Sequence, residues 1–146
     1  MTYPWEAYIQ LAEDLQSPGR DLVIRALDEL WDIPEGRELI MRAPRGERSV
    51  TVHDISENNP TFTTGEANIN YIGLDFGAIA RHQFPTTTGG YRHTSVTETL
   101  VHELFHVGHR ATQMRVAANL NIFGTHIATV PEGFPEGFLP GLQNAL

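Results

Sequence analysis

The spacing of hydrophobic residues changes after the first third of the chain, and this change predicts helices followed by strands. Apolar residues recur every three or four positions over residues 4–16 and 21–31, which favours two amphipathic helices. Pro34 can begin a third, short helix that runs through Met41, because proline is tolerated in a first helical turn. We therefore expect an opening of three helices that acts as scaffold.

Alternation with a period of two takes over in the next segment and predicts a small sheet. Residues 49–55 and 67–76 alternate most clearly, and a short strand over 61–64 and a turn at Gly65 lie between them. Residues 77–94 are rich in Thr, Pro and Gly and predict a loop. We expect an α+β fold with a small, mainly antiparallel sheet. The strand over 67–76 is either a central strand or an edge strand that could bind an extended peptide by main-chain hydrogen bonds.

Helical spacing returns after the loop. Ser95-Val96-Thr97-Glu98 has the form of a capping box, which predicts that a helix begins at Ser95. An apolar stripe follows at helical spacing and is expected to be buried; it comprises Val96, Leu100, Val101, Leu104 and Phe105. The same helix contains the sequence H-E-L-F-H at positions 102–106, which is an H-E-x-x-H motif.

The spacing of this motif suits a catalytic zinc site. Residues four apart share one face of a helix, so His102 and His106 can converge on one ion. Zinc accepts neutral imidazole nitrogens, and a catalytic site keeps one position for water. We therefore predict His102 and His106 as ligands of one Zn²⁺ and Glu103 as the general base that acts on this water.

A catalytic zinc site normally has a third protein ligand, and here several residues compete for that role. The metzincin pattern is excluded, because its histidine position is occupied by Thr112. Glu132 is our first choice and would give a His₂Glu set, followed by Glu136, His126 and His109. Each glutamate is explained as well by a solvated carboxylate in a Pro/Gly-rich stretch. We expect His109 to assist catalysis by hydrogen-bonding a ligand or lining the cleft.

Composition limits the remaining choices. The 146 residues are enough for one domain, over residues 1–146, with a single core. The net charge of −8 argues against nucleic acid as a partner. No apolar run is long enough for a membrane span, and the N-terminal residues lack the layout of a signal peptide. The absence of cysteine excludes disulfides and thiolate zinc ligands.

Two segments resemble a known family. The sequence H-E-L-F-H-V-G-H at 102–109 is similar to the H-E-L-x-H-x-x-H signature of bacterial effector-type zinc metallopeptidases, which include type III secretion effectors and polymorphic-toxin domains. Residues 26–30 and 33–40 look like the opening of those domains, which has the pattern L-x-x-L followed by P-x-G-R-x-L-L. Residues 50–52 look like the strand that follows this opening in the family. The resemblance covers residues 25–110. The family usually continues with an acidic, arginine-rich motif, where this chain has Gln-Met-Arg-Val and no acidic residue.

The resemblance implies a minimal zincin-like endopeptidase that a specialised bacterial secretion system delivers into a target cell; otherwise the protein would act in the cytoplasm. Its substrate would be a target-cell protein, and it could also bind a cognate immunity protein or a secretion chaperone. His102 and His106 match the family ligands and Glu103 the catalytic base. Two alternatives stay open. One is a metal-binding or metal-free protein-interaction module with a degenerate motif, and the other is a zinc hydrolase that acts on a non-peptide substrate.

A peptidase also needs a donor that stabilises the tetrahedral oxyanion. The candidates from the sequence are Tyr91, Arg92, His93 and His109, and nothing in the sequence ranks them.

Overall fold

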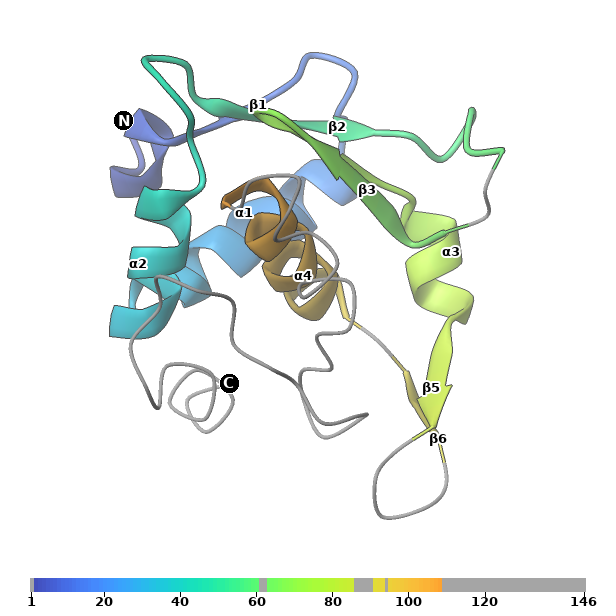
Figure 1. The fold of residues 1–146 in the computed structure, drawn as a ribbon. Helices are drawn as coiled ribbons and strands as arrows, with labels where there is room; N and C mark the ends of the chain where they lie inside the picture. The colour runs from blue at the N-terminus through green and yellow to red at the C-terminus, as the bar shows by residue number, and fades with distance from the viewer. Residues whose placement is uncertain (1, 61–62, 86–90, 94, 109–146) are drawn as a thin grey trace.

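A four-stranded sheet with helices packed against one face forms the fold, which is α+β as predicted (Figure 1). This computed structural model describes residues 2–60, 63–85, 91–93 and 95–108, and for residues 84, 85 and 91–93 only the backbone. The sheet has the order β1-β2-β4-β3 and consists of β1 (Ile9–Leu11), β2 (Val50–Asp54), β3 (Gly65–Asn68) and β4 (Tyr71–Leu74). The helices are η1 (Pro4–Ala7), α1 (Gly19–Trp31), α2 (Pro34–Arg42), α3 (Phe76–Arg81) and α4 (Val96–Gly108).

The prediction of a helix over residues 4–16 was wrong. The chain forms one short 3₁₀ turn, η1, and then β1, which pairs in parallel with β2. Trp5, Ile9 and Leu15 are nevertheless buried, so the apolar positions were identified correctly and the conformation was not. Pairing with β2 provides hydrogen-bond partners for the backbone N–H and C=O groups of this segment, and the local sequence does not reveal this pairing.

The sheet is mixed and not mainly antiparallel. Both β1–β2 and β2–β4 are parallel pairs, and the β3–β4 pair is antiparallel. The strand predicted over 67–76 is in fact a hairpin, because Asn70 has a φ of 54° and turns the chain between β3 and β4. Consequently β4 is central and β3 is an edge strand of the described sheet. Gly65 begins β3 and does not form a turn, and neither of the described residues Thr63 and Thr64 is in a strand.

The described residues of the segment 77–94, which are 77–85 and 91–93, are also more regular than predicted. Helix α3 begins after Asp75, whose carboxylate accepts a hydrogen bond of 2.9 Å from the amide of Ala78. The hairpin of β5 (Gln83–Pro85) and β6 (Tyr91–His93) then leads towards α4. An Asp at the N-cap is a common signal for a helix start, so the sequence did contain the information for α3.

The helices α1, α2 and α4 lie against one face of the sheet and close the core (Figure 1). Helices α1 and α2 confirm the predictions for residues 21–31 and 34–41 to within two residues at each end. Helix α4 contacts both of these helices as well as β3 and β4, so it is the central element of the packing. The opposite face of the sheet is not covered by these helices.

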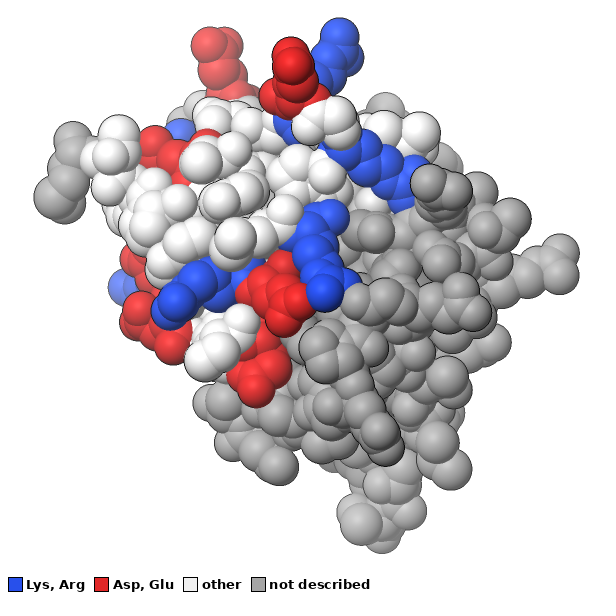
Figure 2. All heavy atoms as spheres, turned by 60° about the vertical axis from the view of Figure 1, so that its left-hand side comes forward, with Lys and Arg blue, Asp and Glu red and all other residues white. Residues whose placement is uncertain are grey.

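Charges of both signs are interspersed on the side of the molecule that carries α2 (Figure 2). Arg42 and Glu38 form an ion pair there, one turn apart on α2. On this view the described arginines do not gather into a patch of one sign. None of the described helices has the length and apolarity needed to cross a membrane.

Candidate metal centre

Helix α4 begins as its sequence predicts. The hydroxyl of Ser95 accepts a hydrogen bond of 3.1 Å from the amide of Glu98, which is the N-cap half of the predicted capping box. Leu100, Val101, Leu104 and Phe105 are fully buried, and Val96 packs against the core. The apolar stripe was therefore predicted correctly, and its burial fixes which face of α4 carries the motif.

The two motif histidines converge. The Nε2 atoms of His102 and His106 are 3.0 Å apart, and the ring centroids are 4.7 Å apart with an angle of 66° between the planes. At this distance one neutral ring can donate an N–H hydrogen bond to the other. Helical spacing brings the residues to one face, and the rotamers point both nitrogens at the same point.

This geometry fits zinc. Two nitrogens that each lie about 2.0–2.1 Å from a tetrahedral ion are roughly 3.4 Å apart. The observed distance of 3.0 Å therefore needs a small rotation of the His102 or His106 ring to admit the ion. The side chain of His102 is 34% exposed, so the site can be reached from solvent.

His102 is also held in the form that binds metal. Burial, and then the neighbouring His106, lower the pKa of His102 from 6.5 to about 4. The ring is therefore neutral at pH 7, and a neutral imidazole nitrogen is the species that zinc binds.

Glu103 lies beside the histidine pair and is almost completely buried, with an exposed fraction of 5%. Its Oε1 atom is 4.0 Å from Nε2 of His102. Burial, and then the charge of Glu66, raise the pKa of Glu103 to about 8. A carboxyl group with this pKa is matched to proton transfer near neutral pH, as a general base requires.

The edge strand β3 covers Glu103 at a glycine. A Cβ atom at Gly65 would be 3.2 Å from Cγ of Glu103 and 3.3 Å from Cγ2 of Thr99. The strand can approach α4 this closely because Gly65 has no side chain. Sequence reasoning missed this role, although an isolated glycine beside a strand pattern is a recognised sign of close backbone approach.

The C-terminal part of α4 is bonded to the loop after α2, and this loop is bonded in turn to the β3–β4 turn. The Nε atom of Arg45, in the loop after α2, donates a hydrogen bond of 3.2 Å to the carbonyl of Val107. The amide side chain of Asn70 accepts a hydrogen bond from the backbone N–H of Arg45 at 2.8 Å and donates one to the Arg45 carbonyl at 2.9 Å. The β3–β4 turn and the loop before β2 are thereby joined beside the motif.

Several predicted site residues lie outside the described residues: Glu132, Glu136, His126 and His109. The sequence also predicts a helix over residues 110–120 and an irregular tail from Gly124 on, and both lie outside the described residues. Tyr91, Arg92 and His93 are in β6, where only the backbone is described. Within the described ranges, no three His, Asp or Glu side chains are grouped closely enough to hold a metal ion. The structure thus brings together His102, His106 and Glu103, and the third ligand stays a prediction.

Comparison of the chain with protein-family models, with curated proteins and with solved structures finds no match in any of the three.

Proposed function

We propose that the protein is a zinc-dependent endopeptidase. The observation that carries the proposal is the convergence of the His102 and His106 Nε2 atoms beside a buried glutamate with a raised pKa. The three residue types, their spacing on one helix and the exposure of His102 to solvent are what a metal-assisted hydrolase requires.

Each residue has a distinct role in this proposal. His102 and His106 would hold Zn²⁺, which when bound supplies Lewis-acid polarisation of a carbonyl and lowers the pKa of water. Glu103 would take a proton from the attacking water and deliver it to the leaving amine. Glu103 keeps its proton at neutral pH in the metal-free protein, and a positive charge beside it favours the ionised form that acts as base.

The substrate proposed is an extended peptide that pairs with the outer edge of β3. Strand β3 lies directly over Glu103 at Gly65, and in the described sheet its other side pairs with β4. An edge strand offers unpaired main-chain groups to a segment that is itself extended. A peptide in this position would have its backbone next to Glu103, where the scissile bond must lie.

The resemblance to effector-type zinc metallopeptidases supports a protein of a target cell as the natural substrate and delivery by a bacterial secretion system. We include a zincin-like fold in the same proposal. It is supported by the mixed sheet, because the antiparallel edge strand β3 packs on the H-E-x-x-H helix. A protein-interaction module with a degenerate motif is the competing function. It is favoured by the 3.0 Å contact between the two imidazoles, which can be satisfied without metal.

The test is a comparison of metal content and proteolysis in two glutamate variants. We expect the purified chain to bind one zinc and to cleave an unfolded model protein such as casein. Glu103→Gln should keep the zinc and lose cleavage by at least about 100-fold, because the base is removed and the ligands stay. Glu47→Gln makes the same chemical change at an exposed loop position and should leave both properties unaltered.

Zinc-loaded Glu103→Gln protein that still cleaves casein at the normal rate would exclude the proposed mechanism. Protein without stoichiometric zinc would favour the interaction module. Stoichiometric zinc, with hydrolysis of esters but of no peptide or protein, would favour a non-peptide substrate.

A further inference from the structure

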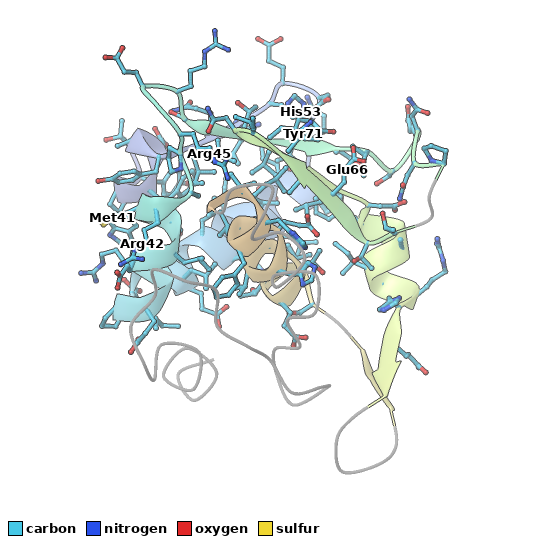
Figure 3. All side chains as sticks on the ribbon, viewed as in Figure 1. Met41, Arg42, Arg45, His53, Glu66 and Tyr71 are labelled. Atoms are coloured by element: carbon cyan, nitrogen blue, oxygen red, sulfur yellow. The ribbon has the colours of Figure 1, made fainter. Side chains whose placement is uncertain are left out.

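We infer that Glu66 makes the proposed peptidase selective for substrates that carry an arginine or lysine at one position opposite β3. This inference rests on the proposed function, because it assumes that the substrate pairs with β3. It concerns the face of the sheet that points away from α4 (Figure 3).

Alternation along β3 separates the two faces. Gly65 faces Glu103, and Ala67 packs against the core, so both lie on the inner side of the sheet. Glu66 and Asn68 are exposed and point to the outer side. On neighbouring strands, residues directly opposite each other point to the same face. The substrate residue opposite Glu66 therefore projects to the outer face, and its two neighbours project towards α4.

The Glu66 carboxylate is held in place on this face. The hydroxyl of Tyr71 donates a hydrogen bond of 3.0 Å to Oε1 of Glu66, and the Tyr71 ring lies 5.0 Å from that of His53. A Cβ atom at Gly73 would be 2.9 Å from the Tyr71 hydroxyl, so this glycine leaves the space that the phenol occupies. A carboxylate fixed in this way loses less side-chain entropy when it binds a cation than a freely rotating one does.

Several carboxylates lie around Glu66. Glu66 and Tyr71 line a cavity of about 590 Å³ together with residues at the end of β2 and in the loops that follow β1 and β2, including Asp14, Asp54 and Glu57. His53 is paired with Asp14 at 3.3 Å inside the same cavity. No arginine is among the described residues that line it. The long side chain of arginine or lysine can reach over Glu66 into this space, whereas an acidic side chain would be repelled.

The experiment is selection of binders from a fully randomised peptide library by zinc-loaded Glu103→Gln protein, which would bind peptides without cleaving them. We expect arginine and lysine to be enriched over aspartate and glutamate about fivefold at one position, the size expected for an ion pair open to solvent. Glu66→Arg in the same background should invert the preference at that position, and Glu66→Gln should remove it. Glu47→Arg makes the same charge change at an exposed loop position and should preserve it.

A basic preference that survives Glu66→Arg, peptides recovered without charge preference, or no bound peptide would each overturn the inference. Cleavage of casein by the wild-type chain reports on the proposed function separately. If the wild type cleaves casein but the Glu103→Gln protein binds peptides without charge preference, only the proposed role of Glu66 is excluded. If binding is selective and depends on Glu66 but the wild type does not cleave casein, the peptidase function is excluded and the cation-selective surface is supported.

Discussion

The two faces of the sheet carry the same kinds of residue in opposite environments. On the inner face, two histidines and a glutamate lie on α4, and Glu103 is 5% exposed. On the outer face, His53, Glu66 and Tyr71 are open to solvent in part or in full (Figure 3). The inner residues are positioned by a buried helix, and the outer ones by hydrogen bonds and ring contacts with one another.

This difference shows how burial determines chemistry. Desolvation is the largest cause of the raised pKa of Glu103 and of the lowered pKa of His102, so both side chains are neutral at pH 7. A neutral imidazole can bind a metal, and a carboxyl group with a pKa near 8 can exchange protons. The outer face, in contrast, supplies charge and a cavity, which suit recognition more than catalysis.

The largest expected effect is the loss of metal binding from the inner face. His102→Ala and His106→Ala should each weaken zinc affinity by at least about 100-fold, since even residues that only support a ligand are worth 10–100-fold. Competitive titration with a chelating dye measures the affinity. His53→Ala is the matched control on the outer face and should bind zinc as the wild type does. If His102→Ala, His106→Ala and His53→Ala all bound zinc with equal affinity, the proposed metal centre would be excluded.

The stability of the metal-free protein should depend on pH through Glu103. The unfolded chain releases this proton near pH 4.5, whereas the folded protein keeps it until about pH 8. The contribution of Glu103 is therefore complete below pH 4.5 and is lost as the pH rises to 8. Glu103→Gln should be more stable than the wild type at pH 8 by roughly 2–5 kcal/mol and nearly equal at pH 4.5. Urea denaturation at the two pH values tests this, and a constant difference between them would contradict the burial effect.

His102 should also make the stability of the folded protein depend on pH, but here stability is lost as the pH falls. Its pKa is about 4 in the folded protein and 6.5 in the unfolded chain, so its contribution to stability is lost as the pH falls from 6.5 to 4. His102→Gln should flatten the stability curve in that range. The same urea series, run on the wild type and on this variant, measures the effect.

Gly65 is where the inner face meets the edge strand. Gly65→Ala should destabilise the protein by about 1–3 kcal/mol, because the new Cβ would lie 3.0 Å from the carbonyl oxygen of Gly73 and close to Glu103. It should also reduce proteolysis by displacing the Glu103 carboxylate. Glu47→Ala, at an exposed loop position, should change stability by less than about 0.5 kcal/mol. Thermal unfolding of both variants decides whether β3 is tightly packed on α4.

The smallest effect concerns the outer face. Burial, and then the hydrogen bond to Glu66, raise the pKa of Tyr71 from 10.0 to about 12. Glu66→Gln should lower that pKa towards 10, as followed by ultraviolet absorbance of the phenolate. Tyr71→Phe should cost about 0.5–1.5 kcal/mol, the usual worth of one hydrogen bond. A Tyr71 pKa unaltered by Glu66→Gln would mean that the two side chains do not interact in solution.

Part of the fold could be read from the sequence because it is encoded locally. Helices α1, α2 and α4 each have an apolar period, and α2 and α4 also have a recognisable start in Pro34 and Ser95. Strand β2 has clear alternation. The first strand could not be read in this way. Residues 9–11 have a local pattern that also fits a helix, and only the parallel partner β2 makes them a strand. The hairpin at Asn70 was missed because alternation continues through both strands and conceals the turn.

By itself, the sequence determined the H-E-x-x-H helix, its cap and its buried stripe, since these depend on residues within a few positions of one another. The tertiary structure alone decided that β3 and not the whole segment 67–76 is the edge strand, and that Gly65 of this strand covers Glu103. It also set the pKa of Glu103, because the desolvation of a carboxyl group depends on everything packed around it and not on its neighbours in the chain.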